Sequence, residues 1–254
     1  MAAKGTTVAR AKVNLPVDID AQLAAEAASI SARLSAPSGD RIIVTQAKTF
    51  KLPDGTETDG PFDAIVVEFV AANFFYEESF ERGNITPPKC FALGLDSNSL
   101  VPSDNSPDKQ AESCASCWAN QFGSSGKGKA CQNTRLLALL PPDATIDTPV
   151  QILKVSPTAI KSFDGYVASV ARAFQKPVRA VLTAIGFDPN SEYSSLRFGN
   201  PRKTDDMQLL LAMDRREEAT ARLLTEPDVS AARVSQPVPA KKAPAKRPAA
   251  AAKR

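Results

Sequence analysis

The amino-acid sequence predicts a mainly β protein of the α+β class. Three observations lead to this prediction: β-rich runs recur between residues 41 and 198, a polar segment with all four cysteines interrupts them, and helical spacing occurs in three separate stretches. The chain has 254 residues, of which 43% are apolar, 6% aromatic and 23% charged. This composition is ordinary for globular proteins, and the length suits one large domain or one domain with a sizeable insertion.

The first helix is predicted over residues 18–34. Behind an acidic cap at Asp18 and Asp20, four apolar residues at 4-3-4 spacing form one helical face: Leu23, Ala27, Ile30 and Leu34. Two β-rich runs follow at 41–52 and 62–75, and the Asp and Gly residues of PDGTETDG between them predict a hairpin loop. Both alternating faces of the second run are apolar, which is typical of a central strand covered on two sides.

The later elements are predicted from the same periodicities. Strands are expected at 134–141, 149–156, 176–187 and 194–198, and helices at 163–174 and 205–224. The last helix has Leu210, Leu211, Met213 and Leu224 as candidate packing residues. The sequence thus predicts about five or six strands with a helix between strand pairs, an order that fits a small OB-like barrel better than a sandwich.

The chain contains no histidine. This excludes Ser-His and Cys-His nucleophile pairs, an imidazole general base and imidazole metal ligands. No run of about 18 apolar residues predicts a membrane-spanning helix, and the N-terminus lacks the apolar core of a secretory signal. We therefore expect an intracellular protein.

The net charge of +3 hides an asymmetry between the tail and the rest of the chain. Residues 235–254 carry six cations and no acid, so residues 1–234 have a net charge of −3. The tail is rich in Pro, Ala, Lys and Arg and has nothing to bury, which predicts disorder. Its cations suit nucleic-acid phosphates, with a purely solubilising tail as the alternative; the candidate contacts are Lys241, Lys242, Lys246 and Arg247.

The four cysteines, Cys90, Cys114, Cys117 and Cys131, have the spacing C-x23-C-x2-C-x13-C and lie in a polar insertion at about 77–133. Four thiolates can complete a tetrahedral zinc shell without histidine, and a closed shell makes the ion structural. We expect one zinc ion that folds a segment lacking a core of its own. Free thiols, two disulfides or a redox CxxC are the alternatives.

Cations and aromatic residues surround the last cysteines. Phe122, Lys127, Lys129 and Arg135 flank Cys131, and the GKGK turn suits phosphates, with a solvated turn as an equal alternative. The spacing matches the start of a Walker loop, but Ala130 replaces the hydroxyl that should meet magnesium. Bases stack on aromatic faces; the candidates are Phe74, Phe75, Tyr76, Phe80, Trp118 and Phe122. Phe74 and Phe75 are neighbours in a strand and point to opposite faces, so at least one of them is expected in the core. Trp118 is the best of them, although packing against the metal site is the more frequent role for such a residue.

The order of these motifs resembles the order found in a group of bacteriophage proteins that are taken to be single-stranded-DNA-binding proteins. That group has P-x-C, C-x2-C-x2-N-x-[FW]-G-S, G-K-G-K-x-C and a following R-x-L strand. The matching residues here are Pro88, Cys90, Cys114, Cys117, Asn120, Phe122, Gly123, Ser124, Lys127, Lys129, Cys131 and Arg135. The resemblance covers about residues 60–200 and implies an OB-like barrel with a zinc-bound insertion that coats DNA in phage replication or recombination. Better-known single-strand binders end in an acidic tail, so the basic tail puts C-terminal partner recruitment in doubt.

The sequence as a whole predicts a non-catalytic binder of single-stranded DNA, with RNA as a further candidate ligand and replication or recombination proteins as partners. We expect a flexible N-terminus at 1–17, an OB-like nucleic-acid-binding domain at 18–226 and a disordered basic tail at 227–254. If a bacteriophage encodes the chain, the host cytoplasm is its compartment. The alternatives are a virion or transcription-associated protein that binds a protein partner through its zinc module, and a metal-dependent nuclease using Glu77 and Glu78.

Overall fold

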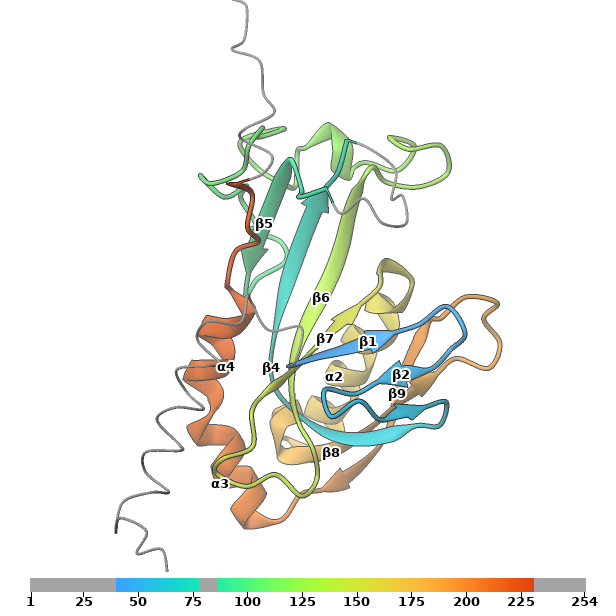
Figure 1. Ribbon diagram of the computed structural model, residues 1–254, viewed down its shortest axis with the longest axis vertical. Helices are drawn as coiled ribbons and strands as arrows, with labels where there is room; N and C mark the ends of the chain where they lie inside the picture. The colour runs from blue at the N-terminus through green and yellow to red at the C-terminus, as the bar shows by residue number, and fades with distance from the viewer. Residues whose placement is uncertain (1–39, 78–85, 231–254) are drawn as a thin grey trace, which may run out of the picture. The chain divides into compact units, whose positions relative to one another are not determined.

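The computed structural model describes residues 40–77 and 86–230. Nine strands form one curled, mixed sheet, a half-barrel (Figure 1). The strands are β1 (Arg41–Val44), β2 (Phe50–Lys51), β3 (Glu57–Thr58), β4 (Phe62–Phe75), β5 (Cys90–Gly94), β6 (Cys131–Leu140), β7 (Gln151–Val155), β8 (Val181–Phe187) and β9 (Leu196–Lys203). Their order is β3-β2-β1-β7-β6-β4-β8-β9, with β5 also on β4. The mainly β, α+β prediction is confirmed, but the sheet has nine strands in place of five or six.

The long strand β4 is the centre of the sheet. Strand β6 pairs with one of its edges, while β8 and then β5 pair with the other. Its side chains alternate between two cores, with Val66 in one and Ile65 in the other, and both are fully buried. The prediction of a central strand covered on both faces is therefore confirmed. A register shift between Val66 and Glu68 marks a bulge in the strand.

Helices cover both faces of the sheet. Helix α2 (Ile160–Phe174) packs on one face through Phe163, Tyr166 and Val170, which confirms the helix predicted at 163–174. Helices α3 (Asp206–Asp214) and α4 (Arg216–Leu223) cover part of the other face. The single helix predicted at 205–224 is thus wrong in detail, because it ends at Asp214 and a second helix starts at Arg216. Leu210 and Met213, predicted to pack, are 61% and 57% exposed.

The hairpin loop predicted in PDGTETDG is present, but it joins β2 to the short β3 and not the two runs at 41–52 and 62–75. The first run divides into β1 and β2 around Lys48, whose φ of 58° lies in the left-handed region. A tight turn at Gly55 then joins β2 to the short β3. Strand β1 pairs in parallel with β7, far along the chain, because alternating apolar residues specify a strand but not its neighbour.

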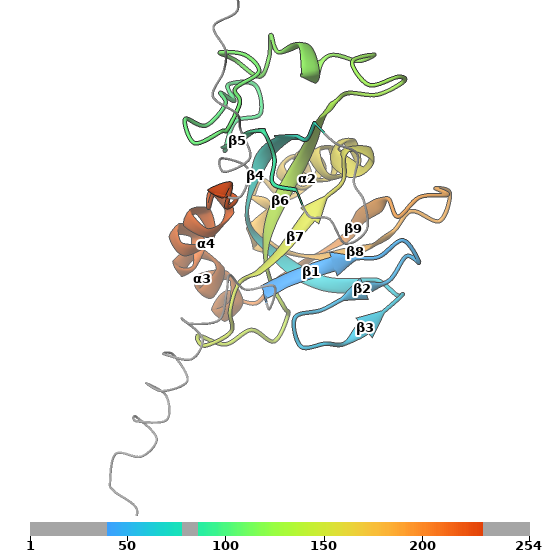
Figure 2. The same cartoon turned by 45° about the horizontal axis from the view of Figure 1, so that its top comes forward.

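The predicted insertion at 77–133 contains β5 and a long segment, 95–130, with only a short 3₁₀ helix, η2 (Trp118–Asn120). Further 3₁₀ helices are η3 (Pro157–Ala159) and η4 (Val178–Ala180). The segment returns over β5, where Leu100 approaches Gly94 so closely that a Cβ there would lie 2.8 Å from its side chain. Figure 2 shows this segment, in green, gathered at the ends of β4, β5 and β6.

The helix predicted at 18–34, the N-terminus at 1–17, the candidate Phe80 and the tail from residue 231 lie outside the described residues. Within the described ranges, no helix combines the length and apolarity needed to cross a membrane.

Candidate functional site

All four cysteines are among the residues that line one small pocket at one end of the sheet. Cys90 is the first residue of β5 and Cys131 the first of β6, and both pair with Phe75, the last residue of β4. Directly opposed residues of neighbouring strands project from the same face. The strands therefore place one thiol on each side of Phe75, both on the face of the sheet that carries α2.

The other two cysteines come from the loop segment. Cys114 and Cys117 line one small pocket together with Cys90 and Cys131. The loop is held there by hydrogen bonds: Cys114 N donates to Leu100 O (3.0 Å) and Asn120 Nδ2 donates to Cys114 O (2.7 Å). All four thiols are buried and free of disulfides. In this geometry, however, no group of three or more His, Cys, Asp or Glu side chains in the described ranges is placed to hold a metal ion.

Burial favours the protonated form of two of these thiols, Cys131 and Cys114. It raises the pKa of Cys131 to about 12, with smaller contributions from the other three cysteines. Burial also raises the pKa of Cys114, although its interaction with the Asn73 side chain acts in the opposite direction. A metal ion would have to displace these protons, since thiolates and not thiols are the ligands.

A second, shallower hollow of about 550 Å³ adjoins the cysteine pocket and shares Phe75 and Gln110 with it. Tyr76 and Trp118 line it, and the Trp118 ring meets Phe75 edge-on at 5.6 Å between centroids. Trp118 nevertheless remains 53% exposed, and its Nε1 donates to Gln110 Oε1 (3.2 Å). The indole thus packs against Phe75, which lines the cysteine pocket, while about half of the residue stays exposed.

Cations border this hollow. Lys129 lines it, and its ammonium lies 5.0 Å from the centroid of the Phe122 ring. The same ammonium donates to Asn120 Oδ1 (3.1 Å), and the Phe122 side chain is 82% exposed. Lys127 is exposed at the tip of the turn, where Gly126 supplies the positive φ of 57° that the reversal requires.

Arg135 lies away from this group. It projects from the same face of β6 as Cys131, but four residues further along, and its guanidinium forms a bidentate ion pair with Asp164 of α2 (3.1 and 2.8 Å). Its side chain is only 13% exposed. The structure therefore brings Phe75, Tyr76, Trp118 and Lys129 to one hollow and places Phe122 against Lys129, whereas Lys127 lies on the adjoining turn and Arg135 lies elsewhere. The predicted contacts Lys241, Lys242, Lys246 and Arg247 lie outside the described residues.

Several lining residues were missed by the sequence analysis. Lys89 lines the hollow and pairs with Glu77, and Gln132 continues the lining onto β6. Asn73 lies behind the cysteines, where its Oδ1 accepts a hydrogen bond from Asn133 Nδ2 (2.6 Å). Lys89 could have been found from its position beside Cys90, whereas the others become neighbours only through strand pairing.

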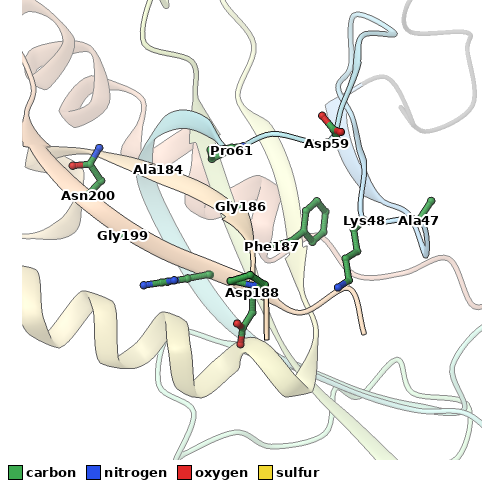
Figure 3. Close-up of a pocket in the computed structure, with 12 residues that line it drawn as sticks. Ala47, Lys48, Asp59, Pro61, Ala184, Gly186, Phe187, Asp188, Gly199 and Asn200 are labelled. Carbon is green, nitrogen blue, oxygen red and sulfur yellow. The ribbon is translucent and has the colours of Figure 1, made fainter. Parts of the chain in front are cut away.

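A separate hollow of about 640 Å³ lies between the β1–β2 turn, β8 and β9 (Figure 3). Lys48, Asp59, Asp188 and Arg197 line it beside the apolar ring of Phe187. Lys48 already donates to the carbonyl oxygen of Ser191 (2.6 Å). Charges of both signs give this hollow no preference for a polyanion, and it contains none of the predicted site residues.

Comparison with known protein families, with curated proteins and with solved structures finds no match to this chain. Its function must therefore be argued from the residues described above.

Proposed function

We propose that this protein binds single-stranded DNA without catalysing a reaction, and that its four cysteines hold one structural zinc ion. The half-barrel would serve as an OB-like scaffold, and the hollow beside Trp118 as the base-binding surface. The observation that carries the proposal is the half-exposed Trp118 ring above a hollow bordered by Lys129.

The zinc proposal depends on the shared pocket. Cys90 and Cys131 are fixed on paired strands, while Cys114 and Cys117 belong to a loop that can close inward. Tetrahedral zinc needs four sulfurs at about 2.3 Å, so binding would draw the loop onto the strands. We expect about one zinc per chain by elemental analysis of protein purified without chelator. Metal-free protein would contradict this part of the proposal.

The nucleic-acid proposal depends on rings and cations in the same place. Stacking of a base on an aromatic ring contributes about 1–3 kcal/mol and tolerates any sequence. Trp118 and Phe122 expose their rings, and Lys127 and Lys129 supply charges for the phosphates between stacked bases. This combination suits flexible single strands better than duplexes, whose bases are already stacked.

The biological setting follows from the resemblance to bacteriophage proteins. We propose that the chain coats exposed DNA during phage replication or recombination inside the host cell. The basic tail would add sequence-independent affinity, so its removal should lower the salt dependence of binding by up to about four log units per log unit of salt, at roughly 0.7 for each of six cations.

Fluorescence titration of Trp118, the only tryptophan, tests the proposal. Single-stranded oligonucleotides should quench it at low salt and duplexes should not, and Trp118→Ala should weaken binding by about 1–3 kcal/mol. Tyr193→Ala is the matched control, because Tyr193 is 73% exposed and lies outside the hollow. Indifference to DNA together with salt-insensitive capture of a protein would instead support the interaction-protein alternative.

A further inference from the structure

Helices α3 and α4 cover only part of the face opposite to α2, and strand register determines which residues share that face. On β4 and β6, Phe74 pairs with Gln132. On β6 and β7, Leu136 pairs with Lys154, and on β7 and β1, Ile152 pairs with Arg41. Opposed residues, and residues two apart in one strand, share a face. Phe74, Lys154 and Arg41 therefore lie on the same side, opposite to the face that carries α2.

These residues form an accessible group. The Lys154 ammonium lies 5.2 Å from the centroid of the Phe74 ring. Arg41 and Lys154 are exposed, and Ile43, two residues after Arg41, is 52% exposed. Although the Lys154 side chain is exposed, partial removal of its ammonium from water, and then the charge of Arg41, lower the pKa of Lys154, so the two cations act on each other.

Several other cations on or beside this sheet are neutralised. Arg135 pairs with Asp164, Arg202 with Asp63, and Arg216 with Glu68. Within residues 40–77 and 86–230, by contrast, neither Arg41 nor Lys154 forms an ion pair. Two adjacent cations without a carboxylate, beside an aromatic ring, have the chemistry that recognises a phosphate with its attached base.

The group is continuous with the hollow beside Trp118. Gln132 lines that hollow and is also the cross-strand partner of Phe74. Tyr76 follows Phe74 by two residues and lines the same hollow. Phe74, Lys154 and Arg41 together form a strip that runs from β4 to β1. It crosses three strand spacings, about 14 Å, which is enough for more than one nucleotide.

We infer that Phe74, Lys154 and Arg41 form a second part of the binding surface, over which a single strand of nucleic acid continues after leaving the Trp118 hollow. The inference rests on the proposed function and extends it to residues that the cysteine motif does not include. Phe74 would stack on a base, and the two cations would contact neighbouring phosphates.

The test removes two charges from the strip and two from elsewhere. Arg41→Gln with Lys154→Gln should weaken binding of a fluorescent oligothymidine about tenfold at 0.1 M salt and lower the salt slope by about 1.4. The control, Arg172→Gln with Arg197→Gln, removes the same charge from exposed arginines on α2 and β9 and should change binding much less. Thermal unfolding of both variants checks that the fold is retained.

The outcomes separate the inference from the proposed function. If the strip variant binds like the wild type while Trp118→Ala binds weakly, the inference is overturned and the proposed function stands. Equal losses in the two double variants would show that only net charge matters and would also overturn it. If the wild type binds no oligonucleotide at low salt, both fail. Ultraviolet crosslinking of oligothymidine to the peptide containing Phe74, read by mass spectrometry, would support the inference independently.

Discussion

The two halves of β4 have different surroundings. Residues 62–70 run between two apolar cores, and the buried Glu68 there is neutralised by Arg179 and Arg216. Residues 71–75 run between cysteine-bearing strands under a loop with little regular structure, beside Lys154, which has no ion-pair partner among residues 40–77 and 86–230. The first half therefore stabilises the fold through its apolar contacts. The second half is surrounded by thiols and a cation that could bind a metal ion or a ligand.

Removing an aromatic ring from the core beneath α2 should lower the free energy of unfolding more than any other change considered below. Phe163 is fully buried and contacts Phe69 and Phe198 edge-on at 5.1 and 5.0 Å between centroids. Phe163→Ala should lower the free energy of unfolding by about 3–5 kcal/mol because it leaves a cavity, as measured by urea denaturation. Phe174→Ala, on the same helix but 39% exposed, should cost much less. Equal losses would contradict the assignment of this half to stability.

Removing the proposed zinc ion should affect only the half of β4 that lies between the cysteine-bearing strands. After chelation, amide hydrogen exchange over residues 111–131 should speed up about a hundredfold, equivalent to about 3 kcal/mol. Amides of β7 and β8 should remain protected, since their cores do not involve the cysteines. Cys117→Ser should reproduce the change without chelator. Faster exchange throughout the sheet would mean that the two halves fold as one unit.

Neutralising Glu68 tests how the first half handles charge. Its Oε2 accepts a hydrogen bond from Arg216 Nε at 2.8 Å and lies 3.7 Å from an Arg179 nitrogen. Glu68→Gln should cost about 2 kcal/mol in the free energy of unfolding because the cations lose their counter-charge. Glu57→Gln, in a half-exposed pair with Lys51, should cost less than about 1 kcal/mol. A smaller loss at Glu68 than at Glu57 would contradict this account.

Replacing Lys154 should change the free energy of unfolding least, and should raise it where the other substitutions lower it. Its pKa is lowered in the fold by burial and by Arg41, so its charge costs stability at neutral pH. Lys154→Met should therefore raise the free energy of unfolding slightly, by less than about 0.5 kcal/mol. The gain should shrink as pH rises through the lowered pKa and vanish above the ordinary lysine range, where the side chain is neutral in both states. Urea denaturation at several pH values measures this, and a gain that grows with pH would contradict it.

Part of the candidate site was predictable. The cysteine spacing and the neighbouring aromatic residues indicated one site, and the structure brings all four cysteines to one pocket next to Trp118. Arg135 was predicted to contact nucleic acid because it follows Cys131. In the structure it forms an ion pair with Asp164 of α2, a helix that is distant in sequence. No local pattern reveals such a partner, because ion pairs of this kind depend on how α2 packs on the sheet.

What the sequence by itself determined is local: the two apolar faces of β4, the buried stripe of α2 and the segment that holds the cysteines. The periodicity of apolar residues depends only on consecutive positions, so it is the same however the remainder of the chain packs. The tertiary structure decided which strands are neighbours, including the parallel pairing of β1 with β7. That pairing depends on burying surfaces from the whole chain at once, and it places Arg41 and Lys154 on the same face of the sheet.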